Sequence, residues 1–379
     1  GSKENNLAAL DMAKKSIVLL KNKSSLLPIK KKGQKITLIG HLANDNNSPL
    51  GNWRGAGDSN TAVTVLEGLE DYGNNSITYK KGVDLYYGET NFHNRVKLNH
   101  TDKTGFKEAK LAAKSADIVV MVLGEEGFQS GEGRSRTELG LPGLQQELLE
   151  EVYKINKNIV LVLMNGRPLN LTWADENIPA ILETWHLGTQ SGNAIAEVLY
   201  GDYNPSGKLT MSFPRNVGQV PIYYNYKKTG RPGASSAEVT RSTYADVENS
   251  PLYPFGYGLS YTSFEYSDLT ISSNEISRGN TIKASVKITN TGKVKGKEVV
   301  QMYIRDHYGS LARPVKELKG FELVELNAGE TKEVSFEIDN SSLIYYTAND
   351  RWESETGKFS VFIGGDSDVK YNKSFDLIN

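Results

Sequence analysis

The pattern of hydrophobic positions alternates short apolar runs with amphipathic segments between residues 35 and 214. The apolar runs predict strands, and the segments whose apolar residues recur three and four positions apart predict helices. The expected strands span residues 35–40, 77–79, 118–123, 159–164 and 180–185, and the expected helices span residues 63–69, 106–115, 143–154 and 192–200. Continuous apolar strands between helices are typical of a parallel sheet covered on both faces. We therefore predict a three-layer α/β sandwich with a mostly parallel sheet over residues 33–214.

Residues 1–32 follow a separate pattern that we interpret as a linker with one amphipathic helix. The apolar positions that recur at helical spacing are Leu7, Leu10, Ala13, Ile17 and Leu20. They predict a helix over residues 6–21, with its lysines off the apolar face. A short extended stretch and the lysine run at residues 30–32 then lead into the α/β domain.

The pattern changes again after residue 214. Residues 215–263 are rich in Tyr, Gly and Pro and show little periodicity, so we expect a long irregular connection, which in a compact protein is usually functional or packed. From residue 264 onward the chain is expected to be all-β, because residues 282–288, 298–304, 331–338 and 358–363 alternate strictly. Several alternating strands over residues 264–379 indicate an immunoglobulin-like or fibronectin type III-like sandwich. The chain has no cysteine, which disfavours the immunoglobulin variant.

Composition narrows the classes of function. The 379 residues carry a formal net charge of -1, so no basic face for nucleic acid is implied. No apolar run approaches the length needed to cross a membrane, and we recognise no signal peptide in this chain. The absence of cysteine excludes disulfides and thiolate metal sites.

The strongest candidate for chemistry is the glycine-rich loop at residues 124–136. It follows an expected buried strand and carries the carboxylates Glu125, Glu126 and Glu132 together with Arg134 and Arg136. In open α/β sheets, ligands bind at the carboxyl ends of strands. Carboxylates placed there by the loop could exchange protons with a bound ligand, which favours general acid/base chemistry. The alternative is that the three carboxylates are solvated or paired with the two arginines. No histidine or D-x-D spacing supports a metal, and we expect no cofactor.

Five other features have competing interpretations. Trp53 stands in a glycine-rich loop, where it either anchors an interdomain surface or stacks on a sugar. The strand ending at Gly40 lacks the G-x-G-x-x-G spacing of a dinucleotide site, and residues 201–208 have the wrong glycine spacing for a P-loop. We interpret His186 as a satisfied structural histidine in preference to a catalyst, and Lys208 as a turn residue.

Six ordered segments together resemble glycoside hydrolase family 3, most closely its bacterial periplasmic β-glucosidase type. They are residues 16–22 (SIVLLKN), 124–142 (the acidic loop through RTELGLP), 163–169 (LMNGRPL), 201–209 (GDYNPSGKL), 252–261 (LYPFGYGLSY) and 313–321 (RPVKELKGF). The family implies a barrel with a nucleophilic aspartate, an α/β sandwich with an acid/base glutamate, and a fibronectin type III-like domain. The chain matches only the second and third of these parts. The resemblance therefore implies a C-terminal portion lacking the N-terminal barrel.

The resemblance also implies roles for individual residues. The family's acid/base glutamate falls on Glu132, and Trp53 falls where the family presents an aromatic wall at the aglycone side. Glu125 is expected to shape the loop, and Arg134 and Arg136 to position it through ion pairs. Without a nucleophile the isolated chain is expected to be inactive, because retaining hydrolysis needs two carboxylates about 5 Å apart.

The partners implied by the resemblance are an oligosaccharide or glycoside and the barrel domain, in cis or as a separate chain. A homodimer is also open, and the resemblance implies a periplasmic or secreted enzyme. The alternative function is a non-catalytic carbohydrate-binding or interaction module of the same fold.

Overall fold

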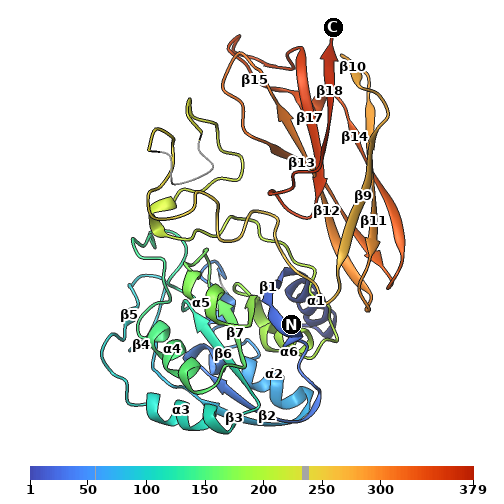
Figure 1. Cartoon of the computed structure of the whole chain (residues 1–379). Coiled ribbons are helices and arrows are strands. Elements are labelled where there is room, and N and C mark those ends of the chain that lie inside the picture. Colours follow the sequence, from blue (N-terminus) through green and yellow to red (C-terminus); the bar gives the residue numbers. More distant parts are fainter. Residues whose placement is uncertain (56, 233–238) are drawn as a thin grey trace. The chain divides into compact units, whose positions relative to one another are not determined.

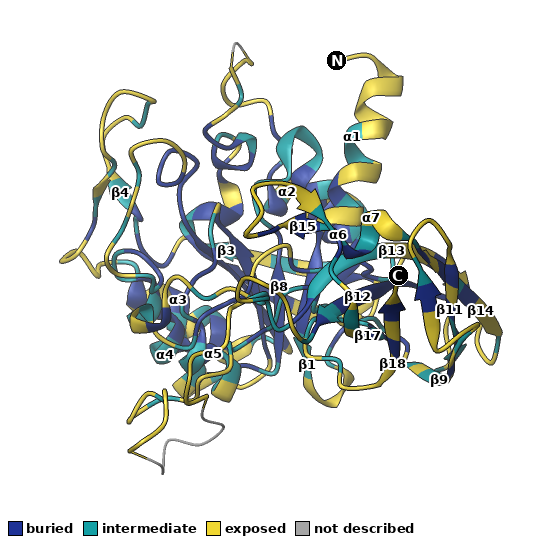
Figure 2. Ribbon diagram, turned by 90° about the horizontal axis from the view of Figure 1, so that it is seen from above, coloured by how far each residue is buried: buried dark blue, intermediate teal, exposed yellow. Residues whose placement is uncertain are grey.

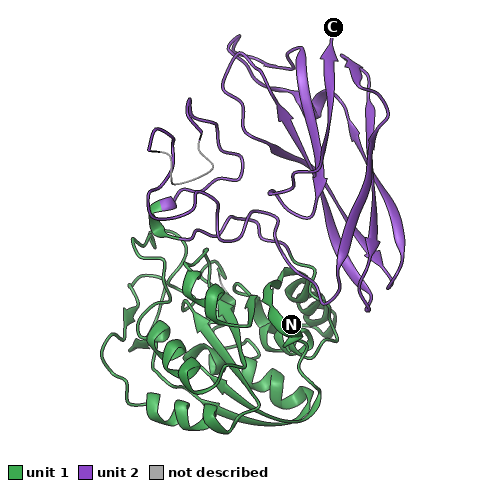
Figure 3. Ribbon diagram, in the orientation of Figure 1, with its two compact units in different colours: residues 1–207, 216–218 green, residues 208–215, 219–379 purple. Residues whose placement is uncertain are grey.

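The computed structural model describes residues 1–55, 57–232 and 239–379, which divide into two compact units. Unit 1 contains residues 1–207 and 216–218, and unit 2 contains residues 208–215 and 219–379 (Figure 3). No helix among the described residues is long and apolar enough to cross a membrane.

Unit 1 is built on a six-stranded sheet with the strand order β1-β8-β7-β6-β2-β3. Its strands are β1 (Val18–Asn22), β2 (Lys32–Ile39), β3 (Asn74–Lys80), β6 (Ile118–Gly124), β7 (Ile159–Met164) and β8 (Ala180–Glu183). Every neighbouring pair is parallel except β1 and β8. All residues of β6 and β7 are buried, as a sheet covered on both faces requires. The prediction of a mostly parallel sheet is confirmed.

Helices lie on both sides of this sheet (Figure 1). They are α1 (Lys3–Ser16), α2 (Val65–Tyr72), α3 (Phe106–Ser115), α4 (Gln145–Ile155), α5 (Thr172–Asn177) and α6 (Ser191–Leu199). Helix α6 packs against α1 and α2, whereas α3 packs against α4. The connection from β2 to β3 contains α2 and runs toward one edge of the sheet, whereas the connection from β3 to β6 contains α3 and runs back past β2. Because both crossovers are expected to be right-handed, opposite directions place α2 and α3 on opposite faces. This arrangement is the predicted three-layer sandwich.

The predicted first helix was wrong at its C-terminal end. Helix α1 ends at Ser16, and Val18–Asn22 forms β1, which pairs antiparallel with β8 at the edge of the sheet. Residues 17–20 are four consecutive apolar residues, each at most 1% exposed. A surface helix buries only one face, so it would leave some of four consecutive residues exposed. Four consecutive buried residues instead fit a strand that is covered on both faces.

Unit 2 contains a β-sandwich of a five-stranded sheet, β10-β18-β17-β12-β13, and a three-stranded sheet, β14-β11-β9. The strands are β9 (Phe264–Ile271), β10 (Glu275–Ser277), β11 (Ile282–Asn290), β12 (Gly296–Asp306), β13 (Glu317–Leu326), β14 (Thr331–Ile338), β17 (Gly357–Gly364) and β18 (Asn372–Ile378). Strand β11 alternates buried and less buried residues along its length, as predicted (Figure 2). Its inward residues join one apolar cluster with those of the facing sheet.

The remaining strands and the last α-helix are short. They are the two-stranded pairs β4 (Tyr86–Tyr87) with β5 (Lys97–Leu98) and β15 (Tyr345–Tyr346) with β16 (Trp352–Glu353), and helix α7 (Asn340–Leu343). In unit 2, the segment before the sandwich folds back on residues 208–215: Phe213 forms a bridge with Tyr253, and Leu209 N donates to Tyr257 O at 2.8 Å. Residues 233–238, which belong to the expected irregular connection, lie outside the described residues.

Candidate functional site

The candidate site lies where the strand order of unit 1 reverses. After β2 the chain turns to one side to form β3, and it then returns to the other side of β2 to form β6. The loops that follow β2 and β6 therefore diverge from neighbouring parallel strands, which is where open α/β sheets form a ligand crevice. Trp53 is in the loop after β2, and Glu132 is in the loop after β6.

The start of the acidic loop is fixed to its neighbours by hydrogen bonds. The Gln145 side chain accepts from Gly124 N at 3.0 Å and donates to Gly124 O at 2.7 Å. Glu125 N donates to Met164 O at 2.7 Å. Gly124 has a φ of 145°, and a Cβ there would lie 2.0 Å from Met164 O, so only glycine fits. The loop thus leaves the sheet along one defined path.

Glu125 pairs with two arginines at the start of the loop. Its carboxylate is 0% exposed and pairs with Arg136 Nη1 at 2.7 Å and with Arg167 Nε at 3.0 Å. Arg167 also donates to Gln129 O, and Arg136 Nη2 donates to Gly140 O at 3.0 Å. For Glu125 and Arg136, the interpretation as an ion pair is correct. Sequence reasoning missed Arg167, although it lies in the NGRPL segment that follows the neighbouring strand β7.

Glu126 is neither solvated nor paired with an arginine of the loop, so both alternatives from sequence fail for it. It is fully buried, and its Oε2 accepts from Phe128 N at 2.8 Å. Burial raises the pKa of Glu126 to about 7, although hydrogen bonds from the Thr90 side chain and the Phe128 amide oppose the shift. Below that pH Glu126 is a neutral acid, and its hydrogen bond from Phe128 N stabilises the first part of the loop.

Glu132, in contrast, is exposed at the outer part of the loop. It stands between Gly131, with a φ of 114°, and Gly133, with a φ of 69°. A Cβ on Gly131 would lie 2.2 Å from Nδ2 of Asn52, which itself donates to Ser130 O at 2.6 Å. The loop after β2 therefore packs directly against the residues that precede Glu132.

Arg134 forms no ion pair with any described residue, contrary to expectation. Its Nη2 donates instead to the carbonyl of Phe92, in the segment between β4 and β5. The Phe92 ring meets the Trp53 ring edge to face, with centroids 6.5 Å apart. Trp53 is 70% exposed. Contacts through Asn52, Arg134 and Phe92 therefore connect the exposed tryptophan with the segment that carries Glu132.

Two buried ionisable groups lie at the base of this region. Burial raises the pKa of Glu183 to about 8, while hydrogen bonds from Trp185 N at 2.9 Å and Asn165 Nδ2 at 3.0 Å oppose the shift. Burial lowers the pKa of His186 to about 4, and its ring lies next to Gly51 and Gly166. His186 is thus neutral at pH 7. Neither of its buried ring nitrogens has a hydrogen-bond partner among the described residues, so the expectation of a satisfied histidine is wrong.

The interpretation of Lys208 as a turn residue was wrong. Its Nζ pairs with Glu298 at 3.0 Å and donates to Gly258 O at 2.7 Å, so it joins segments of unit 2. Among the residues that the structure describes, no group of three or more His, Asp or Glu side chains could hold a metal ion.

Comparison with known proteins identifies both parts of the chain. Residues 17–261 match the glycosyl hydrolase family 3 C-terminal domain, and residues 298–367 match a fibronectin type III-like domain. A periplasmic beta-glucosidase of Salmonella typhimurium is 47% identical over 380 residues, which is 98% of this chain and 50% of the relative. A beta-xylosidase of Formosa agariphila is 40% identical over 384 residues, which is 100% of this chain and 50% of the relative.

Solved structures agree with the sequence relatives. The crystal structure of a β-glucosidase from Listeria innocua in complex with glucose is 36% identical, with a TM-score of 0.89, and the match covers 100% of this chain and 50% of that one. The chain thus spans about half the length of these relatives. These matches establish that the chain belongs to glycoside hydrolase family 3, with the family's C-terminal α/β domain followed by its fibronectin type III-like domain.

Proposed function

We propose that this chain supplies the acid/base carboxylate of a retaining β-glucosidase. In the first step Glu132 donates its proton to the glycosidic oxygen while a carboxylate nucleophile forms the glycosyl-enzyme. In the second step the ionised Glu132 takes a proton from the attacking water, and free sugar is released. The nucleophile is an aspartate on an N-terminal barrel domain, joined in cis or associating as a separate chain.

The observation that carries this proposal is the contrast among the three carboxylates of one loop. Glu125 is neutralised by two arginines, and Glu126 is fully buried. Only Glu132 is exposed, between two glycines with positive φ, at the carboxyl end of a central strand. A proton donor must reach the oxygen of a bound glycoside, and Glu132 is the one carboxylate of the three that a substrate could contact.

The neighbouring residues have supporting roles in this proposal. Trp53 offers an exposed ring that can cover the apolar face of an aglycone sugar. Glu125 fixes the loop through its ion pair with Arg136, and Arg134 fixes it through a hydrogen bond to the Phe92 carbonyl. Glu125, Arg134 and Arg136 are positioning residues, since their contacts are with protein groups.

The proposed substrate is a glycoside or oligosaccharide with terminal β-linked glucose. A β-glucosidase is 47% identical and a β-xylosidase 40% identical, which favours glucose over xylose. A periplasmic or secreted location is proposed for the same reason, because the 47% identical relative is periplasmic.

The test compares the chain alone with the chain joined to its barrel domain. With 4-nitrophenyl β-glucoside, the joined enzyme should turn over, and the chain alone should show no hydrolysis above background. Glu132→Gln in the joined enzyme should lower kcat/KM for unactivated glycosides by about 10²–10⁴-fold, the usual contribution of a general acid. Glu138→Gln, an exposed carboxylate of the same segment, is the matched control and should leave kcat/KM within twofold.

The exposed Trp53 supports a second function, a non-catalytic carbohydrate-binding module. Under that alternative the joined protein would be inactive, and the chain alone would bind short β-glucans with micromolar affinity that Trp53→Ala abolishes. Calorimetry on the isolated chain separates the two functions.

A further inference from the structure

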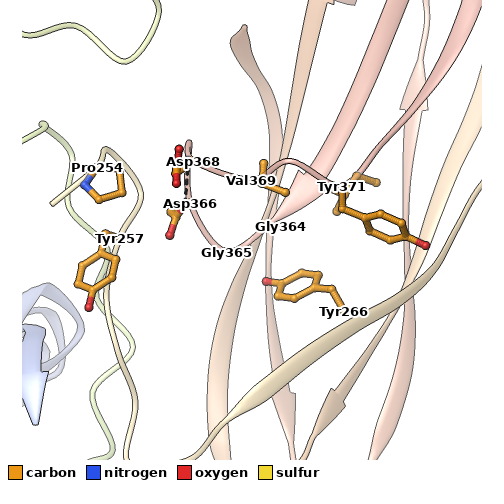
Figure 4. Close-up of a pocket in the computed structure, with 10 residues that line it drawn as sticks. Pro254, Tyr257, Tyr266, Gly364, Gly365, Asp366, Asp368, Val369 and Tyr371 are labelled. Carbon is orange, nitrogen blue, oxygen red and sulfur yellow. Dashed lines mark hydrogen bonds between the residues drawn. The ribbon is translucent and has the colours of Figure 1, made fainter. Parts of the chain in front are cut away.

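Unit 2 contains a pocket of about 520 Å³ that the proposed hydrolysis does not use. Pro254 and Tyr257 form one wall, and the turn between β17 and β18, with Asp366 and Asp368, forms the opposite wall. Figure 4 shows the two carboxylates across from the Pro254 and Tyr257 rings, with the Tyr266 ring beside Gly365. The volume lies within the range of ordinary small-molecule sites.

Hydrogen bonds between its walls hold this pocket open in one shape. Ser367 N donates to Phe255 O at 2.9 Å. The Gln301 side chain donates both to Gly256 O at 3.0 Å and to Gly365 O at 2.5 Å. Gly256 has a φ of 82°, and a Cβ there would lie 2.1 Å from Gln301 Oε1. A ligand therefore meets a pre-formed pocket and need not order a loop.

Asp366 is the polar group that points to a ligand. Its Oδ1 accepts from Asp368 N at 2.8 Å, and among the described residues its Oδ2 accepts no hydrogen bond and the carboxylate forms no ion pair. Burial raises the pKa of Asp366, and the nearby cations Lys208 and Lys316 oppose that shift. Asp368, in contrast, is paired with Lys370 at 2.5 Å. A half-buried acceptor in a pocket with an unused oxygen suits a ligand that donates.

The lining also limits the chemical class of that ligand. The Tyr257 ring stacks on Tyr253, with centroids 5.3 Å apart, which fixes it as a rigid apolar wall of the pocket. The Tyr266 hydroxyl is already engaged, because it donates to Glu298 Oε1 at 3.0 Å. Aromatic walls beside a carboxylate acceptor fit a neutral polyhydroxyl compound and disfavour an anion. The described residues offer no third acidic or histidine ligand for a metal here.

We propose that this pocket binds one glucose unit of a neutral oligosaccharide, with Asp366 accepting from a sugar hydroxyl and Tyr257 covering an apolar face of the ring. The fibronectin type III-like unit thereby carries a sugar subsite of its own. The proposal does not depend on Glu132 or on any barrel domain.

The test is saturation-transfer NMR of the full chain with cellobiose, with glucuronate as the anionic probe. A small ligand of this size should bind with a Kd on the order of 1 mM. Asp366→Asn keeps an oxygen for the Asp368 amide but removes the charge, and it should weaken cellobiose binding about tenfold. Tyr257→Ala should weaken it to a similar degree. Asp268→Asn, the same change at an exposed ion-paired site on β9, is the matched control and should leave the Kd unchanged.

Three results would overturn the proposal. The first is no saturation transfer at 10 mM cellobiose, about ten times the expected Kd. The second is cellobiose binding that survives both pocket variants, or that disappears only in Trp53→Ala, since the sugar would then bind in unit 1. The third is glucuronate binding as tight as that of cellobiose, which would contradict the charge argument. Hydrolysis by the joined enzyme is measured separately, so failure here leaves the proposal for Glu132 standing.

Discussion

Glu126→Gln is expected to change how the stability of unit 1 depends on pH. The Glu126 carboxyl is fully buried, and its pKa rises from the ordinary 4.5 to about 7 because burial disfavours the charged form. The folded state therefore binds a proton between these two values that the unfolded state has released. Stability contributed by this proton is fully present below pH 4.5 and is lost as the pH rises through 7. Glutamine mimics the protonated acid and does not titrate.

The magnitude follows from the size of the shift. A difference of about 2.5 pKa units corresponds to about 3 kcal/mol when fully expressed. Between pH 5 and pH 8.5, about 2.5 kcal/mol of this should appear as a change in the stability difference between variant and wild type. The variant should gain relative stability at the higher pH. Arg54 and Asp45, which also act on this carboxyl with opposite signs, are unchanged in the comparison.

The assay is urea unfolding of the chain at the two pH values, followed by tryptophan fluorescence. Three of the four tryptophans, Trp53, Trp173 and Trp185, belong to unit 1, so the signal reports mainly on that unit. Glu132→Gln, the same substitution at an exposed position of the same loop, is the control for the change of side chain itself. A stability difference for Glu126→Gln that stays within about 0.5 kcal/mol between the two pH values would refute the reasoning.

Three further predictions concern stability. Glu125→Ala leaves Arg136 and Arg167 without their buried partner and should destabilise unit 1 by about 3 kcal/mol in urea unfolding. The exposed Glu138→Ala should cost less than about 0.5 kcal/mol, and equal effects of the two changes would contradict the prediction. Burial lowers the pKa of His186 to about 4, so the wild-type free energy of unfolding should fall by up to about 3 kcal/mol as the pH drops from 6.5 to 4. His186→Gln should lack this fall, and the same dependence of stability on pH in both proteins would contradict the lowered pKa. Lys208→Met leaves Glu298 buried without its cation and should lower the Tm of unit 2, measured by calorimetry, by several degrees. A Tm equal to that of wild type would show that the Lys208–Glu298 pair does not stabilise the fold.

The sequence predicted most of the α/β unit because its strongest signals are local. Strands β6 and β7 are short, wholly apolar runs between amphipathic helices, and both lie where their pattern predicts. Strand β1 was missed because a buried edge strand and the end of a buried helix share the same apolar run. Only its pairing with β8, whose residues lie 158–165 positions away, distinguishes them. Strand β13 was also missed, since only Val324 and Leu326 of its ten residues are buried and the alternation is weak.

The candidate site was predictable only in part for a related reason. Glycines and carboxylates in one segment marked the loop, and the family resemblance selected Glu132 within it. Composition could not show that Glu125 is neutralised by Arg167, which is 42 residues away, or that Arg134 contacts a carbonyl of another loop. Such partners become neighbours only when parallel strands bring their carboxyl ends to one edge of the sheet.

The central claim is that Glu132 is the acid/base residue, and leaving-group dependence tests it most directly. In the enzyme joined to its barrel, Glu132→Gln should lose about 10²–10⁴-fold in kcat/KM with a poor leaving group such as methyl β-glucoside, which needs protonation. It should lose far less with 2,4-dinitrophenyl β-glucoside, which does not. Added azide, which attacks the glycosyl-enzyme without base assistance, should restore turnover and yield β-glucosyl azide. Equal losses with both substrates and no effect of azide would contradict the assignment.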